Sequence, residues 1–181
     1  MRAMRGIAYL AATVGSLALG VIGTASAGSL NLSSEAFAHG GTVPTRYTCD
    51  GCDISPPLAW SDIPSGTRSL ALIVSDPDAP RGTWYHWVLY AIPPTLPGLP
   101  ENVDPRELSA AIHDGMNSWK RSGYGGPCPP TGRHRYFFHL YALDRLLEVP
   151  QQSSATELRR AMQGHVISEA ALLGTYAKRS R

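Results

Sequence analysis

Three long apolar segments predict the centre of a β-sheet. Residues 69–75, 84–92 and 135–143 are nearly continuous apolar or aromatic runs, which indicates strands buried on both faces. Shorter extended pieces precede them, one from Leu30 to Phe37 with a polar bend and one at Ala59-Trp60. Glycine and proline separate these runs throughout. The pattern therefore predicts a mostly-β domain with elaborate loops.

Helical signals come late in the chain. Ser154 and Glu157 have the spacing of a capping box. Apolar residues then recur at roughly helical spacing, at Leu158, Met162, Val166, Ala170 and Leu173. Gly164 lies within this pattern, so we expect it to divide the segment into two short helices. One further helical turn is expected between Pro105 and Ile112.

The first 27 residues have the form of a signal peptide. Arg2 and Arg5 precede an uncharged apolar run from Ile7 to Gly23, and Ala25-Ser26-Ala27 is a small-residue cleavage site. Retention as a membrane anchor is the alternative, although the run is short for a spanning helix. The sequence thus predicts a single domain at residues 28–181, secreted or periplasmic, that is not an integral membrane protein after cleavage.

Charge argues against a nucleic-acid-binding protein. The leader holds two of the 16 Lys and Arg residues and no acidic residue. The rest of the chain therefore balances 14 basic against 14 acidic side chains. A near-neutral domain lacks the basic footprint that nucleic acid requires.

Three cysteines, at positions 49, 52 and 128, allow at most one intrachain disulfide and leave one thiol over. Cys49 and Cys52 have C-x-x-C spacing, but their surroundings predict strand and loop instead of the helix N-terminus of a redox site. A zinc site would need a second pair of ligands at similar spacing, which the sequence lacks.

Two polar clusters at strand ends predict a small pocket. The first combines Asp76-Pro77-Asp78-Ala79-Pro80 with Trp84-Tyr85-His86-Trp87, and the second spans Gly125 to Tyr136. Alternation along a strand places Trp84 and His86 on one face, with Tyr85 and Trp87 on the other. His134 and Tyr136 share a face for the same reason. Asp76 is either a pocket carboxylate or a turn residue, whereas Asp78 has the character of a turn residue.

The chemistry of such a pocket has several interpretations. Two histidines and a carboxylate are able to hold a metal, to act as acid and base, or to bind an anion. The sequence contains no G-x-S-x-G elbow, no H-E-x-x-H motif and no phosphate-binding glycine loop. Without a candidate nucleophile, a binding pocket is favoured over an active site.

Taken together, these motifs resemble the phosphatidylethanolamine-binding protein family, also called Raf-kinase-inhibitor-like proteins, in its bacterial branch. Further matching segments are Tyr47 to Gly51, Ile54 to Leu58, Ser69 to Ile73, Tyr141 to Asp144, and Gly164-His165 with Gly174-Thr175-Tyr176. The resemblance runs over essentially the whole predicted domain. It implies a central antiparallel sheet packed by a smaller sheet, with short helices near the C-terminus.

The resemblance also implies a non-enzymatic pocket for phosphate-like or carboxylate anions, including phospholipid headgroups, without a cofactor or metal. The implied pocket residues are Asp76, Trp84, His86, Gly126, Pro127, His134 and Tyr136. In this interpretation both histidines donate to the anion, and Asp76 fixes His86 or the cationic part of the ligand. The alternatives are an inhibitor that binds a protease or kinase through the pocket rim, and a hydrolase that uses Asp76, His86 and His134.

Two covalent features follow from the resemblance alone. Family members often have a cis peptide before the last proline of the first motif, so Ala79–Pro80 is the expected position. Similar bacterial proteins pair the first and last of these cysteines, which implies a Cys49–Cys128 disulfide with Cys52 free.

Overall fold

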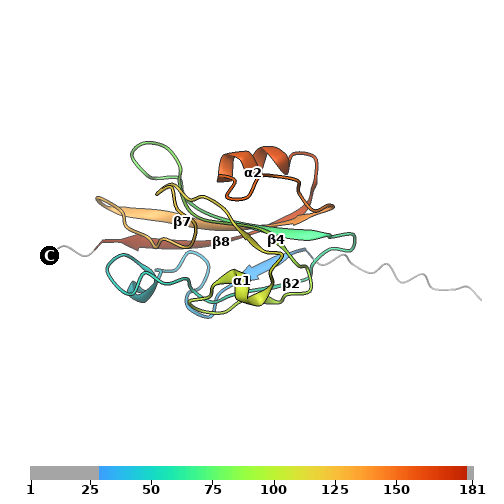
Figure 1. Ribbon diagram of the computed structural model, residues 1–181. Helices are drawn as coiled ribbons and strands as arrows, with labels where there is room; N and C mark the ends of the chain where they lie inside the picture. The colour runs from blue at the N-terminus through green and yellow to red at the C-terminus, as the bar shows by residue number, and fades with distance from the viewer. Residues whose placement is uncertain (1–28, 179–181) are drawn as a thin grey trace, which may run out of the picture.

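The computed structural model describes residues 29–178, and the predicted leader lies outside this range. Two antiparallel sheets face each other (Figure 1). The smaller sheet has the order β1-β2-β5, formed by Asn31–Ser33, Leu58–Ser61 and Gly98–Leu99. The larger sheet has the order β6-β4-β3-β7-β8, formed by His113–Asp114, Trp84–Ile92, Ser69–Asp76, Arg133–Leu143 and Val166–Ala177. This architecture confirms the predicted fold class, with β3, β4 and β7 at the centre of the larger sheet.

A large apolar core fills the space between the two sheets. β3, β4 and β7 contribute Leu72, Trp87 and Phe138, and the smaller sheet contributes Leu32 and Trp60. A second cluster lies on the other face of the larger sheet, beneath helix α2 (Ala155–Ala161). The sheet is therefore covered on both faces, which explains why its central strands are continuous apolar runs.

Short helical elements lie in the connections. A single 3-10 turn, η1, spans Thr45–Tyr47, and α1 spans Pro105–Leu108 within the predicted 105–112 segment. The capping box at Ser154 and Glu157 is present and begins α2. In Figure 1, α2 lies on the upper side of the larger sheet and the smaller sheet on the lower side.

The predicted second late helix is wrong, because residues 166–177 form strand β8. Gly164 has a φ of 78°, a left-handed conformation that turns the chain back after α2. β8 then pairs with β7 from Val166 to Ala177 and buries Leu172 and Tyr176 in the core. Sheet pairing along a neighbouring strand therefore overrides the helical spacing of the apolar residues.

Candidate functional site

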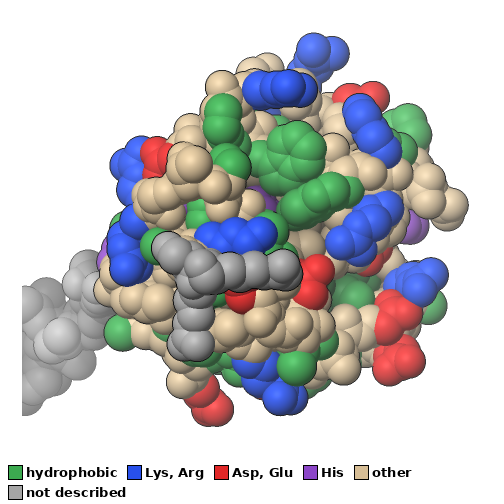
Figure 2. Space-filling model, turned by 90° about the vertical axis from the view of Figure 1, so that its left-hand side faces the viewer, with side chains coloured by type: hydrophobic (Ala, Val, Ile, Leu, Met, Phe, Trp, Pro, Cys, Tyr) green, Lys and Arg blue, Asp and Glu red, His purple; other side chains and the backbone are tan. Residues whose placement is uncertain are grey.

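A cavity of about 360 Å³ opens where β3 ends and β4 begins. One side, which we call the strand wall, consists of Asp76, Trp84 and His86, with Ala79 and Pro80 from the β3–β4 loop. The other side, the loop wall, comes from two loops, the η1–β2 and β6–β7 connections. It consists of Cys49, Asp53, Trp119, Arg121, Gly126, Cys128 and Pro130. Figure 2 views this end of the molecule, where hydrophobic side chains gather beside several Lys and Arg side chains.

A register shift in β4 sets the direction of His86. Val74 pairs with Trp87, but the next residue, Ser75, pairs with Tyr85. His86 is therefore the extra residue of a β-bulge, a feature that redirects side chains beside functional sites. Because of this shift, the prediction that Tyr85 and Trp87 share one face is wrong. Trp87 packs in the core between the sheets, whereas Tyr85 packs against the cluster beneath α2.

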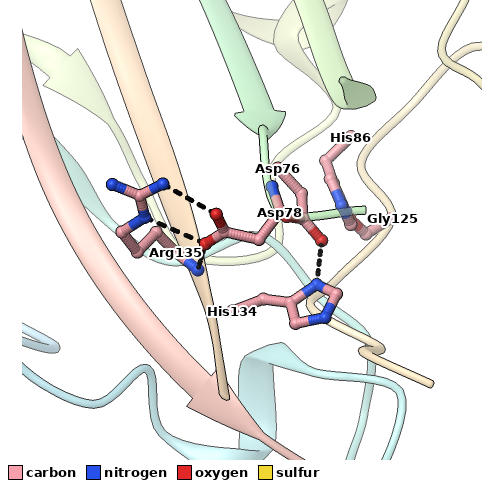
Figure 3. Close-up of polar contacts among 6 residues, drawn as sticks. All are labelled: Asp76, Asp78, His86, Gly125, His134 and Arg135. Carbon is pink, nitrogen blue, oxygen red and sulfur yellow. Dashed lines mark hydrogen bonds and ion pairs between the residues drawn. The ribbon is translucent and has the colours of Figure 1, made fainter. Parts of the chain in front are cut away.

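Asp76 and His134 form a buried pair at the strand wall (Figure 3). His134 Nδ1 donates to Asp76 Oδ2 at 2.8 Å, and Asp76 is only 4% exposed. The other oxygen of Asp76 accepts the backbone N–H of Asp78 at 2.8 Å. Asp76 is thus both a turn residue and a pocket carboxylate, and the histidine that it orients is His134, not His86.

Asp78 points away from this pair and forms an ion pair with Arg135 at the surface. Its carboxylate accepts two hydrogen bonds from the Arg135 guanidinium, at 2.7 and 2.9 Å, and one from the Arg135 backbone (Figure 3). The guanidinium lowers the pKa of Asp78 to about 2. Asp78 lies in the turn after β3, where the sequence predicted a turn residue.

His86 contacts the loop wall through a backbone carbonyl. His86 Nδ1 lies 2.7 Å from the Gly125 oxygen, which only accepts, so Nδ1 carries the hydrogen. Nε2 is buried and has no hydrogen-bond partner in the described part of the chain. Burial lowers the pKa of His86 below its ordinary value. The neutral ring therefore leaves Nε2 as an unsatisfied acceptor beside the cavity.

Tyr136 and His134 support the strand wall from behind. The Tyr136 ring meets His86 edge to face at a centroid distance of 5.2 Å. Its hydroxyl is buried without a partner among the described residues, and burial, together with the charge of Asp76, raises its pKa. Of the predicted residues, Asp76, Trp84, His86 and Gly126 line the cavity, while Pro127, His134 and Tyr136 lie behind its walls.

Trp119 and Arg121 are rim residues that the sequence analysis missed. The Trp119 ring contacts Trp84 and His86 edge to face, at centroid distances of 5.4 and 5.1 Å. Arg121 lies over the Trp119 ring at 5.7 Å. Buried Asn117 holds this loop by accepting from the Trp119 N–H and donating to the Gly123 carbonyl. The available signal was a tryptophan and two cations beside a glycine-rich loop, a pattern that no strand or helix period reveals.

The loop wall joins segments that are distant in sequence. A disulfide links Cys49 to Cys128, as the family resemblance implies, and Cys52 is free and exposed. The Gly126 N–H donates to Asp53 Oδ1 at 2.6 Å, and the Cys49 N–H donates to the Pro127 oxygen at 3.2 Å. A side chain at Gly126 would collide with the backbone of the 47–48 segment, so glycine is required there.

The expected cis peptide at Ala79–Pro80 is absent, because every peptide bond between residues 29 and 178 is trans. Within the same residues, no three His, Cys, Asp or Glu side chains converge to hold a metal ion. No helix of this part of the chain is long and apolar enough to cross a membrane. Cys49 is bonded to Cys128, so the C-x-x-C segment contains no dithiol pair.

Two facing antiparallel sheets and a small cavity at the end of β3 define a β-protein with a polar pocket at its rim. The family model of the phosphatidylethanolamine-binding protein matches residues 33–177. The chain therefore belongs to the phosphatidylethanolamine-binding protein family.

Relatives of similar length support this assignment. A protein of Methanothermobacter thermautotrophicus, named only as a UPF0098 protein, is 50% identical over 150 residues, which cover 82% of this chain and 99% of the relative. The crystal structure of a family homologue from Chlamydia trachomatis is 40% identical, with a TM-score of 0.78 over 83% of this chain and 99% of that one. YbcL of Escherichia coli, described as a member of the mammalian family, is 31% identical, with a TM-score of 0.78 over 84% and 100% of the two chains.

Proposed function

We propose that this protein is exported and binds a small phosphate-like or carboxylate anion, such as a phospholipid headgroup, without converting it. The observation that carries the proposal is His86 Nε2, a buried acceptor of a cavity-lining residue that has no partner among the described residues. Buried polar groups are normally satisfied, and an orphan beside a cavity suggests an absent ligand. The disulfide supports export, because disulfides persist mainly in oxidising compartments.

The tautomer of His86 defines how the anion binds. Since Nδ1 donates to Gly125, neutral His86 offers only an acceptor at Nε2. A fully ionised oxygen cannot donate to this atom. The complex therefore needs one more proton, either on the ligand oxygen or on Nε2, and binding takes up that proton from solution. Trp84 supplies an aromatic face for the cationic part of phosphorylethanolamine.

Calorimetry with phosphorylethanolamine tests the proposal. We expect the affinity of wild type to be at least about tenfold higher than that of His86→Ala, because the variant loses a hydrogen bond to a charged ligand. His113→Ala is the matched control, since His113 lies on β6, outside the cavity lining. Equal affinities of wild type and His86→Ala would refute the proposal.

The pH dependence tests the proton uptake separately. Sulfate keeps its charge between about pH 6 and pH 8, so a change in its affinity reports protein groups. We expect sulfate to bind more tightly at the lower pH, because the anion raises the depressed pKa of His86. An affinity that is independent of pH would contradict the assigned tautomer.

A protein partner is a second candidate, favoured by the rim. Trp119 is 40% exposed, and Arg121 lies over its ring. Tryptophan and arginine are enriched among the residues that dominate protein interfaces. A protease or kinase bound at this rim should lose affinity in Lys120→Gln, because Lys120 is an exposed neighbour of Trp119 outside the cavity lining, while anion binding at His86 is retained.

A further inference from the structure

The strand ends that form the cavity present a second set of side chains on the opposite face of the larger sheet. Ser75, Tyr85 and Phe137 alternate with Asp76, Trp84 and Tyr136 along β3, β4 and β7. In Figure 1 the β3–β4 loop and α2 both rise on this upper side of the sheet. Two binding surfaces therefore share the same strands back to back.

A groove runs between the β3–β4 loop, β7 and α2. It contains one hollow of about 420 Å³ and another of about 570 Å³. Tyr85 and Arg159 line both hollows, which makes them neighbouring parts of one surface. None of the residues that line this groove lines the cavity at His86.

The groove carries unpaired positive charge. Arg159 and Arg160 lie in the last turn of α2, and neither has a carboxylate within ion-pair distance between residues 29 and 178. Arg135, by contrast, is neutralised by Asp78. Two carboxylates act at a distance on this region: Glu157 interacts with Arg160, and Glu169 of β8 acts on His139. Neither carboxylate lines a hollow. A guanidinium without a partner recognises an oxyanion with two parallel hydrogen bonds.

Hydrogen-bonding groups of the groove are also unused. The Nδ1 atom of His139 is buried without a partner among the described residues. Ser75, Thr83, Tyr85 and Thr156 line the groove, and their hydroxyl groups make no hydrogen bond to another described residue. Hydroxyl groups are able to donate to an oxyanion. The positive charge and the free hydroxyl groups of the groove therefore favour the same kind of ligand.

An aromatic ladder forms the apolar side of the groove. The His139 ring stacks between Phe137 and Tyr141, at centroid distances of 5.6 and 5.9 Å and interplanar angles of 19° and 17°. Packing on both sides fixes the plane of the histidine ring. Ring edges carry partial positive charge, which favours contact with a negatively charged group.

We propose that this groove is a second ligand site, which binds an organic phosphate or sulfate monoester. Arg159 holds the oxyanion, the hydroxyl of Tyr85 donates to it, and Phe137 and His139 contact the apolar substituent. The site differs from the cavity at His86 in position and in chemistry, because its cations are permanently charged guanidinium groups.

Phenyl phosphate and phenyl sulfate, followed by NMR, test the proposal and distinguish the two sources of the oxyanion. We expect saturable shifts of the backbone signals of Tyr85 and residues 156–163, both in wild type and in His86→Ala. Arg159→Gln should weaken this binding at least about tenfold, since it removes a hydrogen bond to a charged group. Arg106→Gln is the matched control, because Arg106 is an exposed arginine on α1, outside the groove.

Three results would overturn the proposal: no shift at Tyr85 and residues 156–163, an unchanged affinity in Arg159→Gln, or equally tight binding of neutral benzyl alcohol. Binding of inorganic phosphate as tight as that of phenyl phosphate would refute the role of the aromatic ladder. His139→Phe keeps the stack and the apolar contact, so it should bind phenyl phosphate about as tightly as wild type. Loss of binding in this variant, if it is folded, would refute the role given to the ring. The NMR signals of His86 and Gly126 report ligand binding in the cavity at His86. The two proposals are therefore tested separately, and refuting one leaves the other standing.

Discussion

The strand wall and the loop wall of the cavity differ in what holds them. Asp76, Trp84 and His86 are placed by the pairing of β3 with β4, which continues from Leu70 to Asp76 and includes the bulge at His86. The loop wall depends on a few contacts between segments 73 to 79 residues apart. Among them are one disulfide, one backbone hydrogen bond from Cys49 to Pro127, and one hydrogen bond from the Gly126 N–H to the Asp53 carboxylate. The strand wall should therefore keep its structure when one contact is removed, whereas the loop wall should lose its structure.

Removing the disulfide is the strongest test of this difference. Joint replacement of Cys49 and Cys128 by Ser should lower the free energy of unfolding by about 4 kcal/mol, because the unfolded chain regains the freedom of a long closed loop. Urea unfolding measures this loss as a lower midpoint. We also expect weaker phosphorylethanolamine binding, since Cys49 and Cys128 line the cavity.

Cys52→Ser is the control for the disulfide variant, because Cys52 is exposed and unpaired and its replacement should change neither property. If the disulfide variant kept full anion affinity under conditions where it is folded, the loop wall would not depend on this link.

Asp76→Ala perturbs the strand wall itself. The change leaves His134 Nδ1 and the Asp78 N–H without their acceptor, in a site that is almost fully buried. We expect a loss of about 3 kcal/mol in the free energy of unfolding. Glu148→Ala is the comparison and should have a much smaller effect, because Glu148 is an exposed carboxylate with no ion pair to another described residue.

The backbone signals of β3 and β4 should stay in place in Asp76→Ala even as stability falls. Widespread shifts along both strands would show that the strand wall is no more robust than the loop wall.

Local sequence pattern predicted the strands behind the strand wall and some of its residues, but not their geometry. Spacing of two along β7 placed His134 and Tyr136 on one face, and the continuous apolar runs identified the three central strands. The bulge at His86 was not predictable, because a register shift depends on the partner strand. For the same reason Trp87 was placed on the wrong face, and Asp76 was assigned to the wrong histidine.

Most residues of the loop wall were not predictable from local sequence pattern. Asp53, Trp119 and Arg121 reach the cavity through turns that only tertiary contacts select. The pairing of Cys49 with Cys128 was implied by resemblance, since three cysteines alone leave the choice open. The strand β8 was predicted as helix because its apolar residues fit a helical period, and only pairing with β7 decided between the two.

Asp53 tests the loop wall at a single hydrogen bond. Asp53→Gly removes the acceptor of the buried Gly126 N–H, while glycine tolerates the φ of 56° at this position. We expect a loss of about 1.5 kcal/mol in the free energy of unfolding and faster hydrogen exchange at Gly126. Asp53→Asn keeps both the acceptor and the left-handed conformation, so it should lie close to wild type. If both variants had the same free energy of unfolding and the same exchange rate at Gly126, this hydrogen bond would not stabilise the loop wall.

The smallest effect is expected at Asp78, next to the strand wall but outside the cavity. Its pKa of about 2 lies below that of an unfolded aspartate, so the Arg135 pair contributes stability above about pH 4 and loses it as the pH falls towards 2. Arg135 is more than half exposed, and solvent limits the contribution to less than about 1 kcal/mol. Asp78→Asn should therefore flatten the acid limb of the stability curve slightly and leave phosphorylethanolamine binding unchanged. A large loss of anion affinity in this variant would mean that the strand wall depends on its surface turn as much as the loop wall depends on its links.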